Sequence, residues 1–354
     1  MAFVPLWRLV IQHKGYFMAC TIYDIAKKCN CSTTTVSKVF NNTGKISSEK
    51  REEILKAAKE LGYVRMHSAI SLASSSRSSH LIGVVLHIND EKSITHELFS
   101  EIINSIRIEV EKDGYDICFL RNLKDVDHIT YSQLVNSRGI DGLVILSMNT
   151  KTKKFNELMN TDIPKVSFDL LNSKYYVTSD SKEGVSKMVD YLVKLGHRRI
   201  CYVCPDSAGI AKIRFDGFVE GLRRNNIPFD SRMVISAPYY SSGSSKIATD
   251  KALASGINPT VIMYPDDYTA ISAIPYLRSL GYKVPGDISI TGFDGVELSQ
   301  VMRPSIVTVK QNTKSIGEAL AKLLLNQLNK VEDFEKEITV PVEVFEGESV
   351  KDIN

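Results

Sequence analysis

The sequence predicts an N-terminal all-α domain followed by a larger α/β body of two doubly wound parallel-sheet subdomains. Between residues 21 and 63, apolar side chains recur at helical spacing. From Leu81 onward, short apolar strands alternate with amphipathic helices, which is typical of parallel sheets covered by helices. The serine-rich residues 74–79 separate the two patterns. A chain of 354 residues is long enough for two or three compact units.

Residues 1–17 fit neither pattern. They are apolar, but Pro5, Arg8 and Lys14 interrupt them, and the run is far short of the ~20 residues that span a bilayer. The segment also lacks the small-residue cleavage site of a signal peptide. Met18 lies just before Thr21, where the helical pattern begins. We therefore expect Met18 to be the natural start and residues 1–17 to be a non-native or mis-annotated extension.

Charge is distributed unevenly along the chain. Residues 18–80 contain ten basic and five acidic side chains, whereas residues 81–354 are slightly acidic in total. A basic head on an acidic body favours a polyanionic partner for the head alone. A solvated basic helix face that binds nothing is the alternative.

The six cysteines show no disulfide framework. Cys201 and Cys204 form a CxxC, but the run around them reads as a strand, on which residues three apart point to opposite faces. This arrangement argues against a chelate or a redox pair. We expect reduced thiols in a cytoplasmic protein, with no bound metal.

The head, residues 18–63, contains start and stop signals for three helices. Thr21 is a candidate N-cap with Asp24 three residues on, and Asn30 suits a left-handed turn residue. Ser32 begins a second helix that ends near Phe40. Ser47 begins a third helix, which Gly62 ends. Two short helices joined by a three-residue turn match a helix-turn-helix, a DNA-binding motif.

The second of these helices carries the side chains expected to read DNA. Thr33 and Thr34 can contact base edges, and Lys38 can donate to guanine. Three further polar side chains suit phosphate contacts: Ser32, Ser37 and Asn41. The structural alternative is a small three-helix bundle with no ligand.

At this point the sequence resembles a known family. The runs that carry the resemblance are TIYDIAK from Thr21, STTTVSKVFN from Ser32, ISSEKR from Ile46 and LGY from Leu61. They are similar to the head of the lactose-repressor (LacI) family of transcription regulators. The resemblance implies that Thr33, Thr34 and Lys38 read bases and adds Thr21, Tyr23 and Thr35 as DNA contacts. The family usually has Arg where Lys38 stands. Because Lys lacks the guanidinium fork, base discrimination at this position is either weaker or different.

The resemblance also implies that residues 64–80 form a hinge that orders on operator DNA. Leu72 matches the side chain that wedges into the minor groove. Ala69 would pack on the partner hinge, and Arg65 is a candidate phosphate contact. The segment departs from the family at Arg65 and Met66, where Pro-Asn is usual, so its apolar residues could instead cover the junction with the body.

The body continues the resemblance over residues 81–345, with 346–354 left as a C-terminal tail. Its landmarks are LGHRRI from Leu195, RFDGF from Arg214, DISITGFD from Asp287 and RPSIVTV from Arg303. The fold implied is that of periplasmic sugar-binding proteins, with a ligand cleft between the subdomains. No phosphate-binding loop, nucleophile elbow or zinc motif is present in the sequence. We therefore expect neither enzymatic activity nor a cofactor.

Candidate effector-binding residues follow from family positions and from strand ends, where α/β folds bind ligands. They are His87, Phe99, Asp180, Arg214, Asp266, Asp267 and Asp294. Carboxylates and arginine can grip sugar hydroxyls, and Phe99 offers a stacking face. Structural alternatives remain: Asp180, Asp266 and Asp267 could be helix caps, and Arg214 could pair with a surface acid.

The sequence thus indicates a homodimeric repressor that reads a near-palindromic operator and responds to a small carbohydrate. It has no expected membrane partner. One alternative retains DNA binding but replaces the sugar with a phosphoprotein, because the sequence also resembles the catabolite-control branch of the family. The alternative from another class is a plain solute-binding protein.

Overall fold

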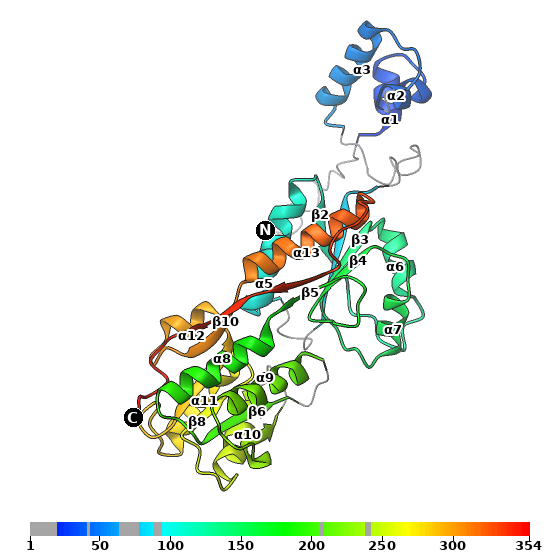
Figure 1. Cartoon of the computed structure of the whole chain (residues 1–354). Coiled ribbons are helices and arrows are strands. Elements are labelled where there is room, and N and C mark those ends of the chain that lie inside the picture. The colour runs from blue at the N-terminus through cyan, green and yellow to red at the C-terminus, as the bar shows by residue number, and fades with distance from the viewer. Residues whose placement is uncertain (1–19, 41–42, 64–77, 88–93, 206–208, 238–241) are drawn as a thin grey trace, which may run out of the picture. The chain divides into compact units, whose positions relative to one another are not determined.

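The computed structural model describes residues 20–40, 43–63, 78–87, 94–205, 209–237 and 242–354. Residues up to 79 and residues from 80 onward form two compact units, called here the head and the body. Three helices make up the described head: α1 (Ile22–Lys28), α2 (Thr33–Phe40) and α3 (Ser48–Glu60) (Figure 1). Each lies where the sequence predicts a helix.

One side chain from each helix forms the centre of the head. Ile25, Val36 and Ile54 are fully buried and belong to one apolar cluster. Leu55 and Leu61 are apolar but exposed. On α3, Ala57 is buried in the core together with Ile54. The head therefore depends on a small core, and its helix caps carry more of its stability than they would in a larger domain.

The first half of the body is a six-stranded parallel sheet of order β11-β5-β4-β3-β1-β2. Its strands are β1 (Leu81–Leu86), β2 (Asp116–Phe119), β3 (Gly142–Ser147), β4 (Lys165–Phe168), β5 (Tyr176–Ser179) and β11 (Glu337–Val340). Its helices are α5 (Glu97–Glu111), α6 (Tyr131–Arg138), α7 (Lys153–Met159) and α13 (Thr313–Leu328).

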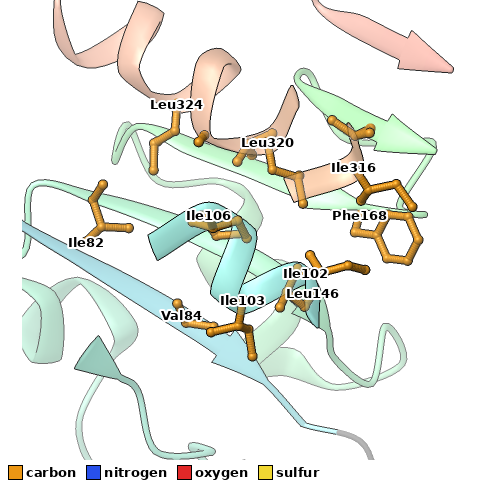
Figure 2. Packing of buried hydrophobic residues seen from close by; sticks show 14 of the residues in the cluster. Ile82, Val84, Ile102, Ile103, Ile106, Leu146, Phe168, Ile316, Leu320 and Leu324 are labelled. Carbon is orange, nitrogen blue, oxygen red and sulfur yellow. The ribbon is translucent and has the colours of Figure 1, made fainter. Parts of the chain in front are cut away.

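Helices cover both faces of this sheet. Val144 packs in the cluster formed with α5 and α13, in which Ile106 and Leu320 are buried (Figure 2). The next residue, Ile145, packs on the other face with α6 and α7. Successive strand residues thus enter separate cores, as expected for a sheet buried on both sides.

The second half is a six-stranded sheet of order β12-β10-β9-β8-β6-β7. Its strands are β6 (Ile200–Cys204), β7 (Val234–Ser236), β8 (Val261–Met263), β9 (Ser289–Asp294), β10 (Val307–Gln311) and β12 (Val342–Phe345). Its helices are α8 (Ser181–Lys194), α9 (Ile210–Arg224), α10 (Ser242–Leu253), α11 (Asp267–Ser279), α12 (Glu297–Val301) and the 3-10 helix η3 (Ser231–Met233). The edge strand β12 is antiparallel to β10, which the prediction of purely parallel sheets did not include.

Cys201 and Cys204 lie on opposite faces of β6, as the strand pattern predicts. Cys201 is buried in the cluster beneath α10 and α11, whereas Cys204 packs against the cluster beneath α8 and α9. All six cysteines of the chain lie in described segments, and each is a free thiol. No helix of the described residues is long and apolar enough to cross a membrane.

The chain crosses between the two halves three times. It leaves the first sheet after β5 to form α8, returns after β10 to form α13, and leaves again between β11 and β12. The first and third crossings are tied together, because the backbone N–H of Asp180 donates to the carbonyl of Val340 at 2.8 Å. The ends of β5 and β10 therefore lie at the junction of the two halves.

Residues 346–354, set apart as a tail from the sequence, pack on the second half. Ser349 is fully buried, and its hydroxyl donates to the Ile290 carbonyl at 2.7 Å. The buried ring of His197 contacts the carbonyl of Lys351 at 3.0 Å. These bonds make the segment part of the body.

Candidate functional site

The start of α1 and the turn between α1 and α2 have the local geometry that the sequence predicts. The backbone N–H and the hydroxyl of Thr21 both donate to Asp24 Oδ2, at 2.8 and 2.7 Å. Asn30 has a φ of 45°, which Asn tolerates better than most residues. Ser32 Oγ accepts the N–H of Thr35 at 3.1 Å. These polar residues therefore cap the starts of α1 and α2, and Asn30 supplies the turn residue between the two helices.

Helix α2 separates its apolar and polar side chains. Val36 and Val39 are buried, whereas Thr34 and Lys38 are exposed and Thr33 and Ser37 are half-buried. Three further predicted contacts differ in exposure: Thr21 and Tyr23 are exposed, and Thr35 is half-buried. Asn41, Arg65, Ala69 and Leu72 lie outside the described residues. The structure thus leaves Thr34 and Lys38 accessible on one face of the helix.

Two basic residues of α3 hold the other helices rather than pointing into solvent. Lys50 Nζ donates to the carbonyl of Cys29, the C-cap of α1, at 2.6 Å. Arg51 donates to the carbonyl of Val39, near the end of α2, at 3.4 Å. Positive charge at a helix C-terminus is favourable. Part of the basic excess of the head is therefore structural.

In the body, polar residues at strand ends from both halves meet at the junction. Ser179 ends β5 in the first half, and Gln311 ends β10 in the second. Ser179 Oγ donates to Gln311 Oε1 at 2.5 Å, and Gln311 Nε2 donates to Asp294 Oδ1 at 2.8 Å. A buried chain of hydrogen bonds thus joins the first sheet to Asp294 at the end of β9.

Asp294 has the most unusual environment of the predicted site residues. It is 2 % exposed, its φ is 111°, and its Oδ2 has no hydrogen-bond partner among the described residues. Burial raises the pKa of Asp294 well above its usual value; Arg214 opposes this shift, and Asp267 and Asp266 add to it. A buried acceptor without a partner is rare and marks a candidate ligand contact.

Arg214 lies beside Asp294 and not at the surface, so the alternative of a surface ion pair is wrong. It is 4 % exposed, and its guanidinium lies 3.5 Å from the centre of the Phe293 ring. It donates to the Pro265 carbonyl at 3.1 Å, and together with Phe293 it lines a small cavity. The same guanidinium lowers the pKa of Asp169, which burial raises. Arg214 therefore balances a carboxyl group from each half.

Asp169, Gln311 and Ser179 were not identified from the sequence. Asp169 directly follows β4, so the strand-end rule applies to it as well. Its φ is 54°, and its Oδ1 accepts the hydroxyl of Thr178 at 2.7 Å. Gln311 lies two residues beyond the RPSIVTV landmark, and the sequence shows no sign that its strand ends against β5.

The remaining predicted effector residues have structural contacts. Asp180 is the N-cap of α8 and accepts the N–H of Glu183 at 3.3 Å. Phe99 is 5 % exposed, belongs to the core of the first half, and packs edge-on against His96. His87 is half-buried after β1, and its Nε2 lies 3.4 Å from the Leu120 carbonyl. For Asp180 the hydrogen bond supports the capping alternative, and for Phe99 the packing supports a core role.

Asp266 and Asp267 are both fully buried, but they hold different elements. Asp266 is the N-cap of α11 and accepts the N–H and the hydroxyl of Thr269 at 2.8 and 2.7 Å. Asp267 accepts bonds from outside its own helix, from Gly295, Val296 and Thr308. Burial raises the pKa of Asp267 to about 7, and the hydrogen bonds it accepts oppose this rise.

Comparison with known proteins supports the division into head and body. Residues 21–65 match the family of bacterial regulatory proteins named lacI, and residues 189–350 match the periplasmic binding protein-like domain. The repressor PurR of Vibrio vulnificus is 25 % identical over 342 residues, with 94 % of this chain and 99 % of PurR covered. The regulator MalR of Clostridium butyricum is 29 % identical and covers 93 % of this chain and 98 % of its own.

Solved structures show the same architecture. The Lac repressor dimer bound to operator and the anti-inducer ONPF matches with a TM-score of 0.77 and 25 % identity, covering 94 % of this chain and 99 % of that one. The CelR–cellobiose complex matches with a TM-score of 0.70 at 22 % identity, covering 93 % and 99 %. The relatives are transcription regulators, and the matches span both head and body. The chain therefore carries a head of the lacI family of bacterial regulatory proteins and a periplasmic binding protein-like body, and it is a DNA-binding transcription regulator.

Proposed function

We propose that this chain is a cytoplasmic, homodimeric repressor whose affinity for a near-palindromic operator changes when a neutral carbohydrate binds at the junction of the two body halves. The observation that carries the proposal is the buried group of Asp294, Arg214 and Asp169. It joins both halves, and no described residue forms a hydrogen bond with Asp294 Oδ2. The exposed polar face of α2 supplies the DNA-reading part.

For the head, the proposal assigns base reading to Thr33, Thr34 and Lys38. Their short or flexible side chains let α2 approach the major groove closely. Phosphate and positioning contacts are assigned to Thr21, Tyr23, Ser32, Thr35, Ser37, Asn41 and Arg65. Ala69 and Leu72 are assigned to the hinge. A dimer with two such heads would read two half-sites related by two-fold symmetry.

For the body, the balance of charge supports a neutral polyhydroxy ligand. Arg214 is the basic side chain that acts on Asp294, whereas Asp267 and Asp266 add negative charge nearby. An anionic ligand such as a phosphate would be repelled by these carboxylates, but sugar hydroxyls can donate to them and accept from the guanidinium. The proposal therefore adds Asp169 and Gln311 to Arg214 and Asp294 as effector contacts.

Such a ligand changes operator affinity only if it binds two states of the body unequally. The chain crosses between the halves three times, and the Ser179–Gln311–Asp294 hydrogen bonds lie at two of these crossings. A ligand that bonds to Asp169 and Asp294 together would favour one arrangement of the halves. This supports coupling between the site and the rest of the dimer.

The test combines site selection with a sugar panel. The full-length chain would be used to select binding sites from genomic DNA, and affinity for the selected duplex would be measured with and without ribose, cellobiose and related sugars. We expect a near-palindromic site and a sugar that changes the affinity at least tenfold. The absence of sequence-specific sites would refute DNA regulation. A change caused only by a phosphorylated carrier protein would refute the carbohydrate effector.

A further inference from the structure

Asp267 accepts three hydrogen bonds, all from residues outside α11. Its Oδ2 accepts the backbone N–H groups of Gly295 and Val296 at 2.8 and 2.9 Å. Its Oδ1 accepts the hydroxyl of Thr308 on β10 at 2.6 Å. The residue is fully buried at the first position of α11. One carboxyl group therefore ties α11 to the turn after β9 and to the neighbouring strand.

The turn that Asp267 holds has an uncommon backbone. Asp294 and Gly295 follow one another with φ angles of 111° and 77°. L side chains rarely adopt a φ as positive as that of Asp294, and such a conformation persists only where the surroundings impose it. The two N–H groups bound by Asp267 directly follow Asp294. They therefore restrain the backbone immediately after Asp294, in addition to the pairing of Asp294 with Lys310 on β10.

Two glycines make room for this arrangement. A Cβ on Gly292 would lie 2.1 Å from Asp267 Oδ1, so the carboxylate reaches the turn only because position 292 has no side chain. A Cβ on Gly295 would lie 2.5 Å from Lys310 Cγ. The absence of a side chain at position 292 thus lets β9 and α11 lie close enough for Asp267 to reach the turn.

We propose that Asp267 is a positioning residue, which holds Asp294 in the backbone conformation that directs its unpaired oxygen to the effector. This inference rests on the proposed function of Asp294 as an effector contact. It differs from the expectation that Asp267 binds the effector itself, because both of its oxygens are already engaged within the protein.

Two substitutions separate positioning from other roles. Asn at position 267 keeps the shape and every bond, since its oxygen accepts the two N–H groups and its amide donates to Thr308 Oγ1. Ala removes all three bonds. If folding of the Ala variant fails, Thr308→Val removes one bond while leaving the turn contacts in place. A matched control is Asp230→Ala, because Asp230 also accepts a backbone N–H, that of Arg232 at 2.9 Å.

The first measurement needs no effector. Amide hydrogen exchange of the ligand-free, full-length protein would be followed in peptides covering Gly295 and Val296. We expect exchange at least tenfold faster in Asp267→Ala, a smaller increase in Thr308→Val, and wild-type rates in Asp267→Asn and Asp230→Ala. Wild-type protection in both Asp267→Ala and Thr308→Val would overturn the proposal.

The second measurement tests the link to Asp294, with ribose, cellobiose and related sugars as probes in titration calorimetry. Asp267→Ala should weaken at least tenfold the binding of a sugar that binds the wild type, and Asp267→Asn should bind it as the wild type does. Equal sugar affinity in Asp267→Ala and wild type would overturn the proposal. Asp294→Asn should lose sugar binding but keep slow exchange. If no sugar binds the wild type, the proposed effector class fails, and the exchange rates still decide whether Asp267 holds the turn.

Discussion

The head and the body expose their polar residues in opposite ways. In the head, Thr34 and Lys38 point into solvent, and the core beneath them is formed by other residues. In the body, Asp294 and Arg214 are 2 % and 4 % exposed and depend on one another. The surface proposed to read DNA can therefore change without loss of stability, whereas the buried site proposed for a small ligand cannot. Four substitutions test this difference.

The largest effect is expected from Arg214→Ala. Without the guanidinium, Asp169 and Asp294 stay buried but lose the positive charge that lowers the pKa of both carboxyl groups. Breaking such a buried charge group costs about 3–5 kcal/mol. We expect the unfolding temperature of the body to fall by several degrees in calorimetry and the sugar response to disappear. An unchanged unfolding temperature would show that the buried site is as tolerant as the head.

The second effect concerns the pH dependence of body stability. Burial raises the pKa of Asp267 to about 7 from 3.8, so the unfolded chain releases this proton first as pH rises. The contribution of protonated Asp267 to the free energy of unfolding is complete below pH 4 and is lost as the pH rises through 7. Burial also lowers the pKa of His96 to about 4. The stability that neutral His96 contributes is therefore lost as the pH falls from 6.5 through 4, the opposite direction to that of Asp267.

Comparison with Asp267→Asn separates these two groups. Between pH 5 and 8 the wild type should lose roughly 3 kcal/mol relative to the Asn variant, since the proton is held for about two pH units of this range and each unit corresponds to about 1.4 kcal/mol. Thermal unfolding of both proteins across this range would measure it. Parallel curves would contradict the assignment of the shift to Asp267.

The third effect belongs to the DNA-reading face. Lys38→Ala should weaken operator binding by roughly 1–3 kcal/mol, the usual value of a base contact. Stability should change by less than about 0.5 kcal/mol, because Lys38 is exposed. Titration of the selected operator duplex, with Lys56→Ala on α3 as a surface control, would measure the loss. Equal losses in both variants would indicate a general charge effect instead of base reading.

The smallest effect is expected at a helix cap of the head. Ser47 Oγ accepts the N–H of Lys50 at 3.3 Å and begins α3. Ser47→Ala should cost about 1 kcal/mol of local stability. Hydrogen exchange of head peptides in the full-length protein should rise about fivefold, while body peptides keep their rates. No change in the head would mean that its core, and not its caps, determines its stability.

The sequence predicts the head better than the body site, for a physical reason. Helix caps such as Thr21 and Ser47 act on residues three positions away, so their role is visible in a short stretch of sequence. The alternation of short apolar strands and amphipathic helices in the body is similarly local and was predicted. By contrast, the pairing of β5, β10 and β11 depends on the three crossings.

The site depends on the same long-range pairing. Asp294 and Arg214 were predicted, but Gln311 and Asp169 meet them only because β10 and β4 end at the same junction. The role of Asp267 was missed for another reason. Its partners Gly295 and Val296 are 28 and 29 residues away along the chain, and no local pattern indicates the bond.

The three crossings also determine the order in which the chain can fold during synthesis. The first half has most of its strands once β5 is made, but its core still lacks α13, whose Ile316, Leu320 and Leu324 are fully buried. The second half in turn lacks β12 and Ser349 until the last residues emerge. Neither half can close its core on a growing chain before synthesis is nearly complete. A chain released early would expose apolar surface in both halves, and such a fragment is prone to aggregate.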